Sequence, residues 1–135
     1  MSKLLSAYQN LKKQNNEIVY LFKVGLFYNF LNDDAITMSN VLHLKISNLS
    51  SSIVKCGFPC NAFEKYIKLL SSLPYKIKII DSLENNTIFE LKDFELNQKI
   101  KDFLKKIASI DIDDISVAEA YSLLESLQQE ANNLL

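Results

Sequence analysis

The amino-acid sequence predicts an α/β fold of the α+β kind, a mixed β-sheet flanked by helices, with further helices added at the C-terminal end. Three patterns predict it. Residues 18–24 alternate with apolar side chains on both faces, as in a strand covered on both sides. Residues 2–14 and 93–134 carry apolar side chains every three or four positions, which is typical of helices. Short runs between serine, asparagine and proline supply the other strands.

The central strand is expected at residues 18–24, after an N-terminal helix at residues 2–14 that stops at Asn15. Gly25 interrupts this run, and the apolar spacing then changes to that of one helix stripe, which comprises Phe27, Phe30, Leu31, Ala35, Met38 and Leu42. The pattern therefore predicts a strand, a glycine corner, and a helix that continues to about His43.

A hairpin follows, with short strands at residues 44–49 and 53–58 joined by a serine-rich turn. Asn61 with Glu64 three residues later predicts a capping box. The helix that it opens runs to Leu73, because Pro74 cannot continue it.

The last strands of the sheet are predicted at residues 75–79 and 87–91, with Asn85 and Asn86 in the turn between them. Two amphipathic helices follow within residues 93–135, and Ser116 with Glu119 caps the second one. Adjacent acids at Asp33 and Asp34 diverge on a helix, and we expect them on a solvated helix face.

The net charge of −1 conceals two unlike parts of the chain. Residues 1–80 contain ten lysines and four acids, whereas residues 81–135 contain five lysines and twelve acids. A basic front half is compatible with nucleic-acid binding and equally with ordinary solvation. Every basic residue except His43 is lysine, so bidentate reading of guanine by arginine is excluded, and sequence-specific recognition in the major groove is not expected.

Enzyme chemistry finds little support in the composition. Gly25 and Gly57 are the only glycines, so neither a phosphate-binding loop of the G-x-x-x-x-G-K-[ST] type nor a G-x-G-x-x-G turn exists, and ATP binding is excluded. A single histidine makes a hydrolytic triad improbable. Cys56 and Cys60 are interpreted as small apolar side chains because too few other ligands accompany them for a metal site. We expect no enzyme activity, metal or cofactor.

No membrane segment is predicted, because the most apolar window, residues 18–31, is interrupted by Lys23 and Asn29 and falls short of the ~18 residues that a spanning helix needs. The first residues lack the apolar core of a secretion signal, so the cytoplasm is the expected location.

Two motifs resemble the N-terminal mismatch-recognition domain, domain I, of the MutS family of DNA mismatch-repair proteins. That family's pattern runs Y-x-x-L-K, E-I-hydrophobic, G-D-F-Y-E-hydrophobic-F and D-D-A, and residues 8–35 follow it in order. The family's G-I-P-x-H-A-hydrophobic-E-x-Y pattern is matched at Gly57, Pro59, Ala62, Glu64 and Tyr66. The resemblance covers residues 4–82 and leaves no room for the connector, lever, clamp or ATPase domains of the family.

The resemblance implies a MutS domain I-like unit at residues 1–92. The helical periodicity beyond it predicts a C-terminal helical extension at residues 93–135, packed on the same domain. The resemblance also implies that Phe27 is a wedge that enters the base stack at a mispair, within a DNA-binding site of Phe27, Tyr28 and Asn29. The family's glutamate, which hydrogen-bonds the displaced base, is replaced here by Asn29, and the preceding aspartate is replaced by Leu26. The loss of two negative charges should strengthen indiscriminate contact with DNA and weaken the preference for mispairs.

The function expected from the resemblance is binding of mismatched or distorted double-stranded DNA by this wedge and by lysine contacts to phosphates, without ATPase activity. Periodicity alone instead favours burial of Phe27 at the head of a helix stripe. The alternative function is a protein-interaction or regulatory module on the same scaffold with little DNA affinity. Its partner would be a second copy, as a homodimer, or a MutS-like protein, bound along the apolar stripe of the C-terminal helices.

Overall fold

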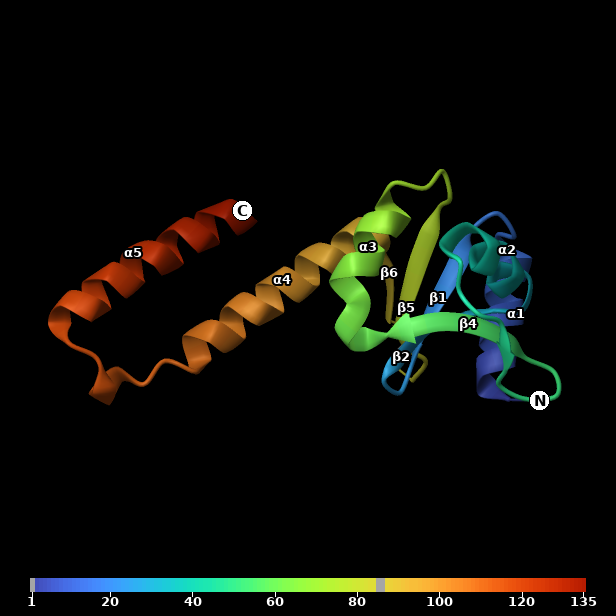
Figure 1. The fold of residues 1–135 in the computed structure, drawn as a ribbon, viewed down its shortest axis with the longest axis horizontal. Coiled ribbons are helices and arrows are strands. Elements are labelled where there is room, and N and C mark those ends of the chain that lie inside the picture. The colour runs from blue at the N-terminus through green and yellow to red at the C-terminus, as the bar shows by residue number, and fades with distance from the viewer. Residues whose placement is uncertain (1, 85–86) are drawn as a thin grey trace. The chain divides into compact units, whose positions relative to one another are not determined.

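The computed structural model describes residues 2–84 and 87–135, which divide into two compact units with the boundary after Lys92. The first unit is built on a six-stranded sheet with the strand order β3-β4-β2-β1-β5-β6 (Figure 1). Its strands are β1 (Val19–Val24), β2 (Phe27–Leu31), β3 (Ser47–Asn48), β4 (Val54–Pro59), β5 (Ile77–Ser82) and β6 (Thr87–Glu90).

The sheet is mixed, as the sequence predicts, and β1 lies at its centre. β1 pairs in parallel with β5, with Leu21 opposite Ile79, and antiparallel with β2, with Leu21 opposite Phe30. The pairs β2–β4, β3–β4 and β5–β6 are antiparallel. The first four residues of β1 are buried, which confirms that this strand is covered on both faces.

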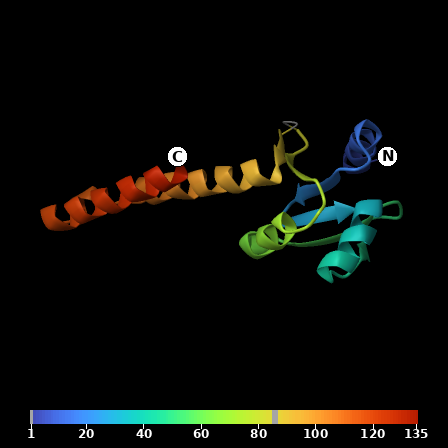
Figure 2. The same cartoon turned by 90° about the horizontal axis from the view of Figure 1, so that it is seen from above.

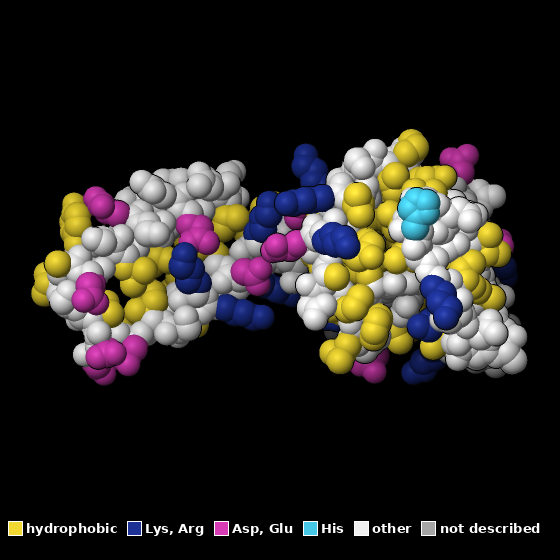
Figure 3. Space-filling model, in the orientation of Figure 1, with side chains coloured by type: hydrophobic (Ala, Val, Ile, Leu, Met, Phe, Trp, Pro, Cys, Tyr) yellow, Lys and Arg dark blue, Asp and Glu magenta, His cyan; other side chains and the backbone are white. Residues whose placement is uncertain are grey.

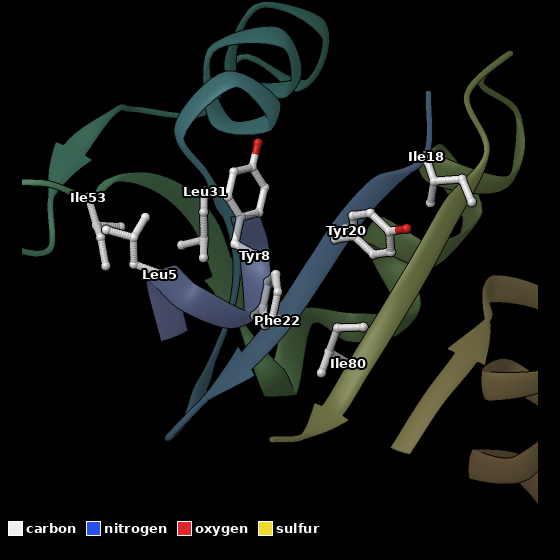
Figure 4. Close-up of a cluster of buried hydrophobic side chains, with 8 residues drawn as sticks. All are labelled: Leu5, Tyr8, Ile18, Tyr20, Phe22, Leu31, Ile53 and Ile80. Atoms are coloured by element: carbon white, nitrogen blue, oxygen red, sulfur yellow. The ribbon is translucent and has the colours of Figure 1, made fainter. Parts of the chain in front are cut away.

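Helices cover both faces of the sheet. α1 (Lys3–Gln14) lies on one face, and α2 (Asn32–Leu42) and α3 (Phe63–Ser71) lie on the other (Figure 2). Under α1, a cluster of buried side chains joins the helix to three strands, with the ring of Tyr8 edge-on to that of Phe22 at 6.4 Å between centroids (Figure 4). Its members are Leu5, Tyr8, Ile18, Tyr20, Phe22, Leu31, Ile53 and Ile80.

The helix predicted to begin near Phe27 is wrong in its first half, because residues 27–31 form strand β2. β1 and β2 make a tight hairpin in which Val24 pairs with Phe27 and Gly25 takes a φ of +61°, a conformation that glycine adopts without strain. The bulky side chains at Tyr28, Phe30 and Leu31 are buried on both faces of the sheet, which favours a strand. α2 begins only at Asn32.

Smaller differences concern the ends of elements. The capping box predicted at Asn61 and Glu64 is wrong: α3 begins at Phe63, after a short 3-10 turn over Cys60–Ala62, and has no side-chain cap. β3 is reduced to two residues, and β5 begins at Ile77 rather than at residue 75. His43 ends α2 in a left-handed conformation, which confirms it as a helix-end residue. The turn predicted at Asn85 and Asn86 lies outside the described residues.

An ion pair ties α1 to α2. Lys12 Nζ lies 2.9 Å from Asp34 Oδ1, and the Tyr20 backbone N–H donates to Asp34 Oδ2 at 3.1 Å. Asp34 is only 4% exposed, so the expectation that it lies on a solvated helix face is wrong. Burial raises the pKa of its carboxyl group, and the hydrogen bonds from Lys12 and Tyr20 oppose that rise.

The second unit is a helical hairpin of α4 (Leu91–Ala108), whose first two residues belong to the first unit, and α5 (Val117–Leu134). Ser116 caps α5, because its Oγ accepts the Glu119 N–H at 3.1 Å, as the sequence predicts. A short 3-10 turn over Ile112–Asp114 lies between the helices. Among the helices of the described residues, none is long and apolar enough to cross a membrane.

Candidate nucleic-acid interface

The tip of the β1–β2 hairpin exposes two apolar side chains. Leu26 is 80% exposed and Phe27 is 46% exposed, although both adjoin well-packed strands. The Cys60 N–H donates to the Leu26 carbonyl at 2.8 Å and fixes the turn to the end of β4. Phe27 itself pairs with Val24 on one side and Pro59 on the other. The burial of Phe27 favoured by helix periodicity is therefore wrong, since the ring lies at a strand end and faces solvent.

Tyr28 projects from the opposite face of β2 and is 4% exposed. Its ring lies 5.7 Å from that of Phe58 and 5.4 Å from that of Phe63, and Phe58 in turn stacks on Tyr66 at 4.3 Å. Burial is the main cause that raises the pKa of the Tyr28 hydroxyl. This aromatic group anchors the strand that carries Phe27 to β4 and α3.

Asn29 shares the face of Phe27 and lies between Phe22 of β1 and Gly57 of β4. It is 3% exposed, and its Oδ1 is a buried oxygen without a hydrogen-bond partner among the described residues. Gly57 makes this arrangement possible, because a Cβ there would collide with the Tyr28 carbonyl and with Asn29 Oδ1. The unpaired acceptor is costly to bury and is available to a donor that reaches it.

Lys55 completes the surroundings of the exposed ring. Its Nζ lies 5.9 Å from the centre of the Phe27 ring, within the range of a cation–π contact. Lys55 pairs with Leu31 across the sheet and therefore faces the same side as Phe27, and Gly57 contributes no side chain between Lys55 and Pro59. The arrangement offers an apolar ring for stacking beside a cation that can contact a phosphate.

The structure thus separates the three predicted site residues: the Phe27 ring is exposed, whereas the side chains of Tyr28 and Asn29 are buried. Sequence reasoning did not single out Lys55, because its place beside Phe27 depends on the β2–β4 register. The face of the first unit seen in Figure 3 carries lysines separated by neutral and apolar surface rather than one basic patch.

Possible metal ligands and thiols are the other groups that could carry chemistry. Residues 2–84 and 87–135 contain no group of three or more histidine, cysteine, aspartate or glutamate side chains placed to hold a metal ion. Cys56 and Cys60 are free thiols, and burial raises the pKa of Cys56 to about 11.

Comparison with known proteins gives consistent matches. DNA mismatch repair protein MutS of Chlorobium chlorochromatii is 34% identical over 84 residues, and that of Rickettsia akari is 36% identical over 87 residues. The protein of the same name from Rickettsia africae is 34% identical over 87 residues. Each match covers 62% of this chain but only 10% of the relative, so the chain matches about a tenth of the length of these proteins.

The family model for MutS domain I matches residues 2–106. This range extends beyond the residues 4–82 expected from the motifs, and it takes in most of α4 while leaving α5 outside. The match covers well over half of the sequence, and it includes both motifs and the whole six-stranded sheet. The chain belongs to the MutS domain I family.

Proposed function

We propose that this chain binds mismatched or otherwise distorted double-stranded DNA in a mismatch-repair-related role, with Phe27 as the wedge that enters the base stack. The observation that carries the proposal is the half-exposed Phe27 ring at the tip of the β1–β2 hairpin, in a chain of the MutS domain I family. A half-exposed aromatic ring at a tightly fixed turn stabilises the fold less than a buried one, since about half of its surface stays in water.

The preference for a mispaired over a matched duplex arises from a property of the DNA. A mispaired base stacks and pairs poorly, so a ring inserted beside it meets a smaller unstacking penalty than at a paired step. The stacking gained is about 1 to 3 kcal/mol per base in proteins that bind single strands. A wedge supported by the β1–β2 and β2–β4 pairs therefore selects the deformable step without reading its sequence.

Tyr28 and Asn29 have different parts in this proposal. Tyr28 holds β2 against Phe58 and Phe63 and so fixes the direction of the Phe27 ring. Asn29 offers its unpaired Oδ1 to a donor on the displaced base. Because both side chains are buried, direct contact with DNA requires local movement of β2, and this makes the Asn29 contact weaker than that of the wedge.

Lysines hold the phosphates, with Lys55 nearest to the wedge. A unit with few such contacts binds DNA weakly and with a steep dependence on salt. The chain acts without ATPase activity or a cofactor of its own, since Gly25 and Gly57 are too few for a phosphate-binding loop. DNA binding requires no membrane, and the location proposed for the chain is the cytoplasm.

The test measures fluorescence anisotropy of one labelled duplex with a single mispair or unpaired base, and of the matched duplex, for the native chain and for Phe27→Ala. We expect native binding to favour the distorted duplex and Phe27→Ala to lose roughly tenfold in affinity for it, as about 1.4 kcal/mol of stacking implies. Tyr75→Ala is the control, because Tyr75 is also an exposed ring, 38% accessible, in the first unit. Equal losses of affinity in Phe27→Ala and Tyr75→Ala, or no binding of the native chain to either duplex, would contradict the role of Phe27 as a wedge.

Lys55→Gln separates phosphate contact from wedging. Loss of one phosphate contact should lower the slope of log affinity against log salt by about one unit and leave the ratio between the two duplexes unchanged. Lys68→Gln, which changes an exposed lysine of α3, is the control. An unchanged slope for Lys55→Gln would show that this lysine does not touch the DNA.

A second function, a protein-interaction module, is favoured by the exposed apolar side chains of α4 and α5. Its partner is either a second copy of the chain or a MutS-like protein. Failure of DNA binding in every arm of the anisotropy experiment, together with association through these helices, would support this function instead.

A further inference from the structure

The β1–β2 turn exposes a second apolar side chain next to the wedge. Leu26 is 80% exposed, more than any other large apolar side chain that the structure describes within residues 2–84. Gly25 and Leu26 form a two-residue loop between the paired residues Val24 and Phe27, and of these two only Gly25 has a positive φ. Such a short loop between paired strands allows little movement, so the exposure of Leu26 is a fixed property of the turn. Figure 3 shows apolar side chains at this end of the first unit.

Leu26 and Phe27 lie on opposite sides of the turn. The Cys60 N–H donates to the Leu26 carbonyl at 2.8 Å, which continues the β2–β4 ladder by one step. Side chains alternate along such a ladder, so Leu26 follows the face of Tyr28, whereas Phe27 lies on the other face. We call Leu26 and Phe27 the tip pair, since together they give the turn one apolar side chain on each side.

Each side of the tip pair has a lysine of its own. Lys55 Nζ lies 5.9 Å from the centre of the wedge ring on one side. On the other side, Lys23 is paired with Tyr28 and therefore shares the face of Leu26. Lys23 Nζ lies 4.0 Å from Asp81 Oδ1, and the lysine side chain is 41% exposed, so its amine remains accessible to a second anion.

We propose that the tip pair enters the minor groove of the duplex and contacts both strands, one on each side of the turn. Phe27 and Lys55 engage the strand that carries the displaced base, whereas Leu26 and Lys23 engage a deoxyribose and a phosphate of the complementary strand. This two-strand contact rests on the wedge function proposed above, and it adds a second strand and a preference for deoxyribose over ribose.

The geometry of the groove is the first reason. Proteins that insert apolar side chains between base steps approach from the minor groove, and the kink that they cause bends the duplex toward the major groove. Such a bend opens the minor groove, whose two walls are the sugar–phosphate backbones of the two strands. A turn that enters this groove therefore meets one strand on each side, and the tip pair with its two lysines has matching side chains on both sides.

The chemistry of Leu26 is the second reason, and it selects the sugar. The leucine side chain has neither a donor nor an acceptor, so it suits the C–H surface of a deoxyribose. In RNA the minor groove displays 2′-hydroxyl groups. A hydroxyl group pressed against Leu26 gives up hydrogen bonds to water without a replacement, which is unfavourable. Leu26 thus favours a complementary strand of deoxyribonucleotides.

The two lysines are the third reason, because they place one cation on each side of the turn. Phosphate contacts fix the position and orientation of a protein on the duplex without reading its sequence. Contacts to both strands hold the turn across the groove, so that the Phe27 ring meets the mispair from one direction.

The first experiment measures fluorescence anisotropy of three duplexes that share one unpaired base. One is entirely deoxyribose, the second has a short run of ribonucleotides in the complementary strand opposite the unpaired base, and the third has 2′-fluoro nucleotides there, which lack the hydroxyl group. We expect the affinity of the native chain to fall about tenfold for the ribonucleotide duplex, as burial of one unpaired hydroxyl group implies. The 2′-fluoro duplex should bind like the deoxyribose duplex. Equal affinity for the deoxyribose and ribonucleotide duplexes would overturn the proposal.

Leu26→Asn tests whether this preference comes from the tip pair. Asparagine is close to leucine in size but forms hydrogen bonds with a hydroxyl group, so the variant should bind the deoxyribose and ribonucleotide duplexes equally. Leu69→Asn is the control, because Leu69 is an exposed leucine of α3, 45% accessible, and this variant should keep the native preference. A preference for deoxyribose that persists in Leu26→Asn would overturn the role of Leu26.

The position of the ribonucleotides tests the two sides separately. When they are moved into the strand that carries the unpaired base, they face Phe27 instead of Leu26 and should lower the affinity of the native chain much less. Equal losses from both strands would overturn the assignment of Leu26 to the complementary strand.

Salt dependence tests the second lysine. Lys23→Gln should lower the slope of log affinity against log salt by about one unit, and Lys23→Gln combined with Lys55→Gln by about two, because the two lysines contact separate phosphates. Lys68→Gln is again the control. An unchanged slope for Lys23→Gln would overturn the phosphate contact to the complementary strand.

The results for the wedge and for Leu26 are distinguishable. Phe27→Ala should weaken binding to the deoxyribose and ribonucleotide duplexes by the same factor and keep their ratio. A loss of affinity in Phe27→Ala without any effect of ribose would count against Leu26 alone. A preference for deoxyribose that disappears in Leu26→Asn, together with full affinity in Phe27→Ala, would count against the wedge alone. Absence of binding to every duplex would overturn both.

Discussion

The two units of this chain bury their apolar side chains to very different extents. In the first unit, α1, α2 and α3 cover both faces of a six-stranded sheet, and side chains such as Leu21, Phe30 and Ile79 are completely buried. In the second unit, α5 buries none of its residues, although it is twice as long as α3. The first unit therefore has a hydrophobic core of its own, whereas α5 gains little stability from burial within its own unit.

The largest test of this contrast is removal of one large side chain from each unit. Phe30→Ala should destabilise the first unit by about 3 to 5 kcal/mol, because Phe30 is fully buried and its removal leaves a cavity on the face of β2 that α2 and α3 cover. Leu124→Ala should change the free energy of unfolding of the monomer by less than about 0.5 kcal/mol, because the residue is 67% exposed. Urea denaturation at low protein concentration measures both, and similar losses would contradict the contrast.

Two ion pairs of equal length give a finer test. Lys12–Asp34 and Lys106–Glu130 both measure 2.9 Å, but their side chains are 18% and 6% exposed in the first pair and 49% and 40% exposed in the second. Asp34→Ala should cost about 2 kcal/mol, because it leaves Lys12 and the Tyr20 N–H without their acceptor. Glu130→Ala should cost at most about 0.5 kcal/mol. Equal costs in thermal unfolding would show that burial does not decide the strength of these pairs.

The pH dependence of the same carboxyl group follows from its raised pKa. In the folded state Asp34 holds its proton to higher pH than in the unfolded state, where its pKa is 3.8. Its contribution to stability is therefore greatest below pH 3.8 and falls as the pH rises through the folded pKa. The native chain should lose stability relative to Asp34→Asn over that interval in urea titrations at several pH values. A relative gain with rising pH would mean that Lys12 outweighs burial.

The smallest expected effect lies within the first unit, at its two thiols. Cys56 is 1% exposed, its Sγ donates to the Ala35 carbonyl at 3.3 Å, and its pKa is raised to about 11. Cys60 is only half-buried, so at pH 8 a disulfide reagent such as Ellman's should modify Cys60 first and Cys56 only on unfolding. Cys60→Ser removes the fast phase and identifies it. Rapid modification of Cys56 in the folded chain would contradict the packing of β4 against α2.

Much of the fold is accessible from the sequence, because local patterns and long-range packing agree. The central strand, the mixed sheet and the Ser116 cap follow from alternation, spacing and a capping motif. The sequence predicts a helix for residues 27–31 because their large side chains fit a period of 3.6 as well as a period of two. Pairing with β1 and β4 decides between them, and that pairing is not a local property.

The candidate site, too, could be predicted only in part from the sequence. Family motifs point to the turn that carries Phe27, even though the helix predicted there is wrong. Lys55 is 28 positions further along the sequence, and only the β2–β4 register brings its amine to the ring. The burial of Asp34 escaped prediction for a related reason, because its partner Lys12 belongs to another helix.

Gly57 has a consequence for how this surface can change during evolution. Because any side chain there would strike the main chain of the neighbouring strand, every descendant that keeps this sheet must keep the glycine. Variation in what the hairpin tip recognises is thereby directed to positions such as Leu26, which is exposed, and Lys55, which is only half-buried. One invariant residue thus leaves its neighbours free to diversify.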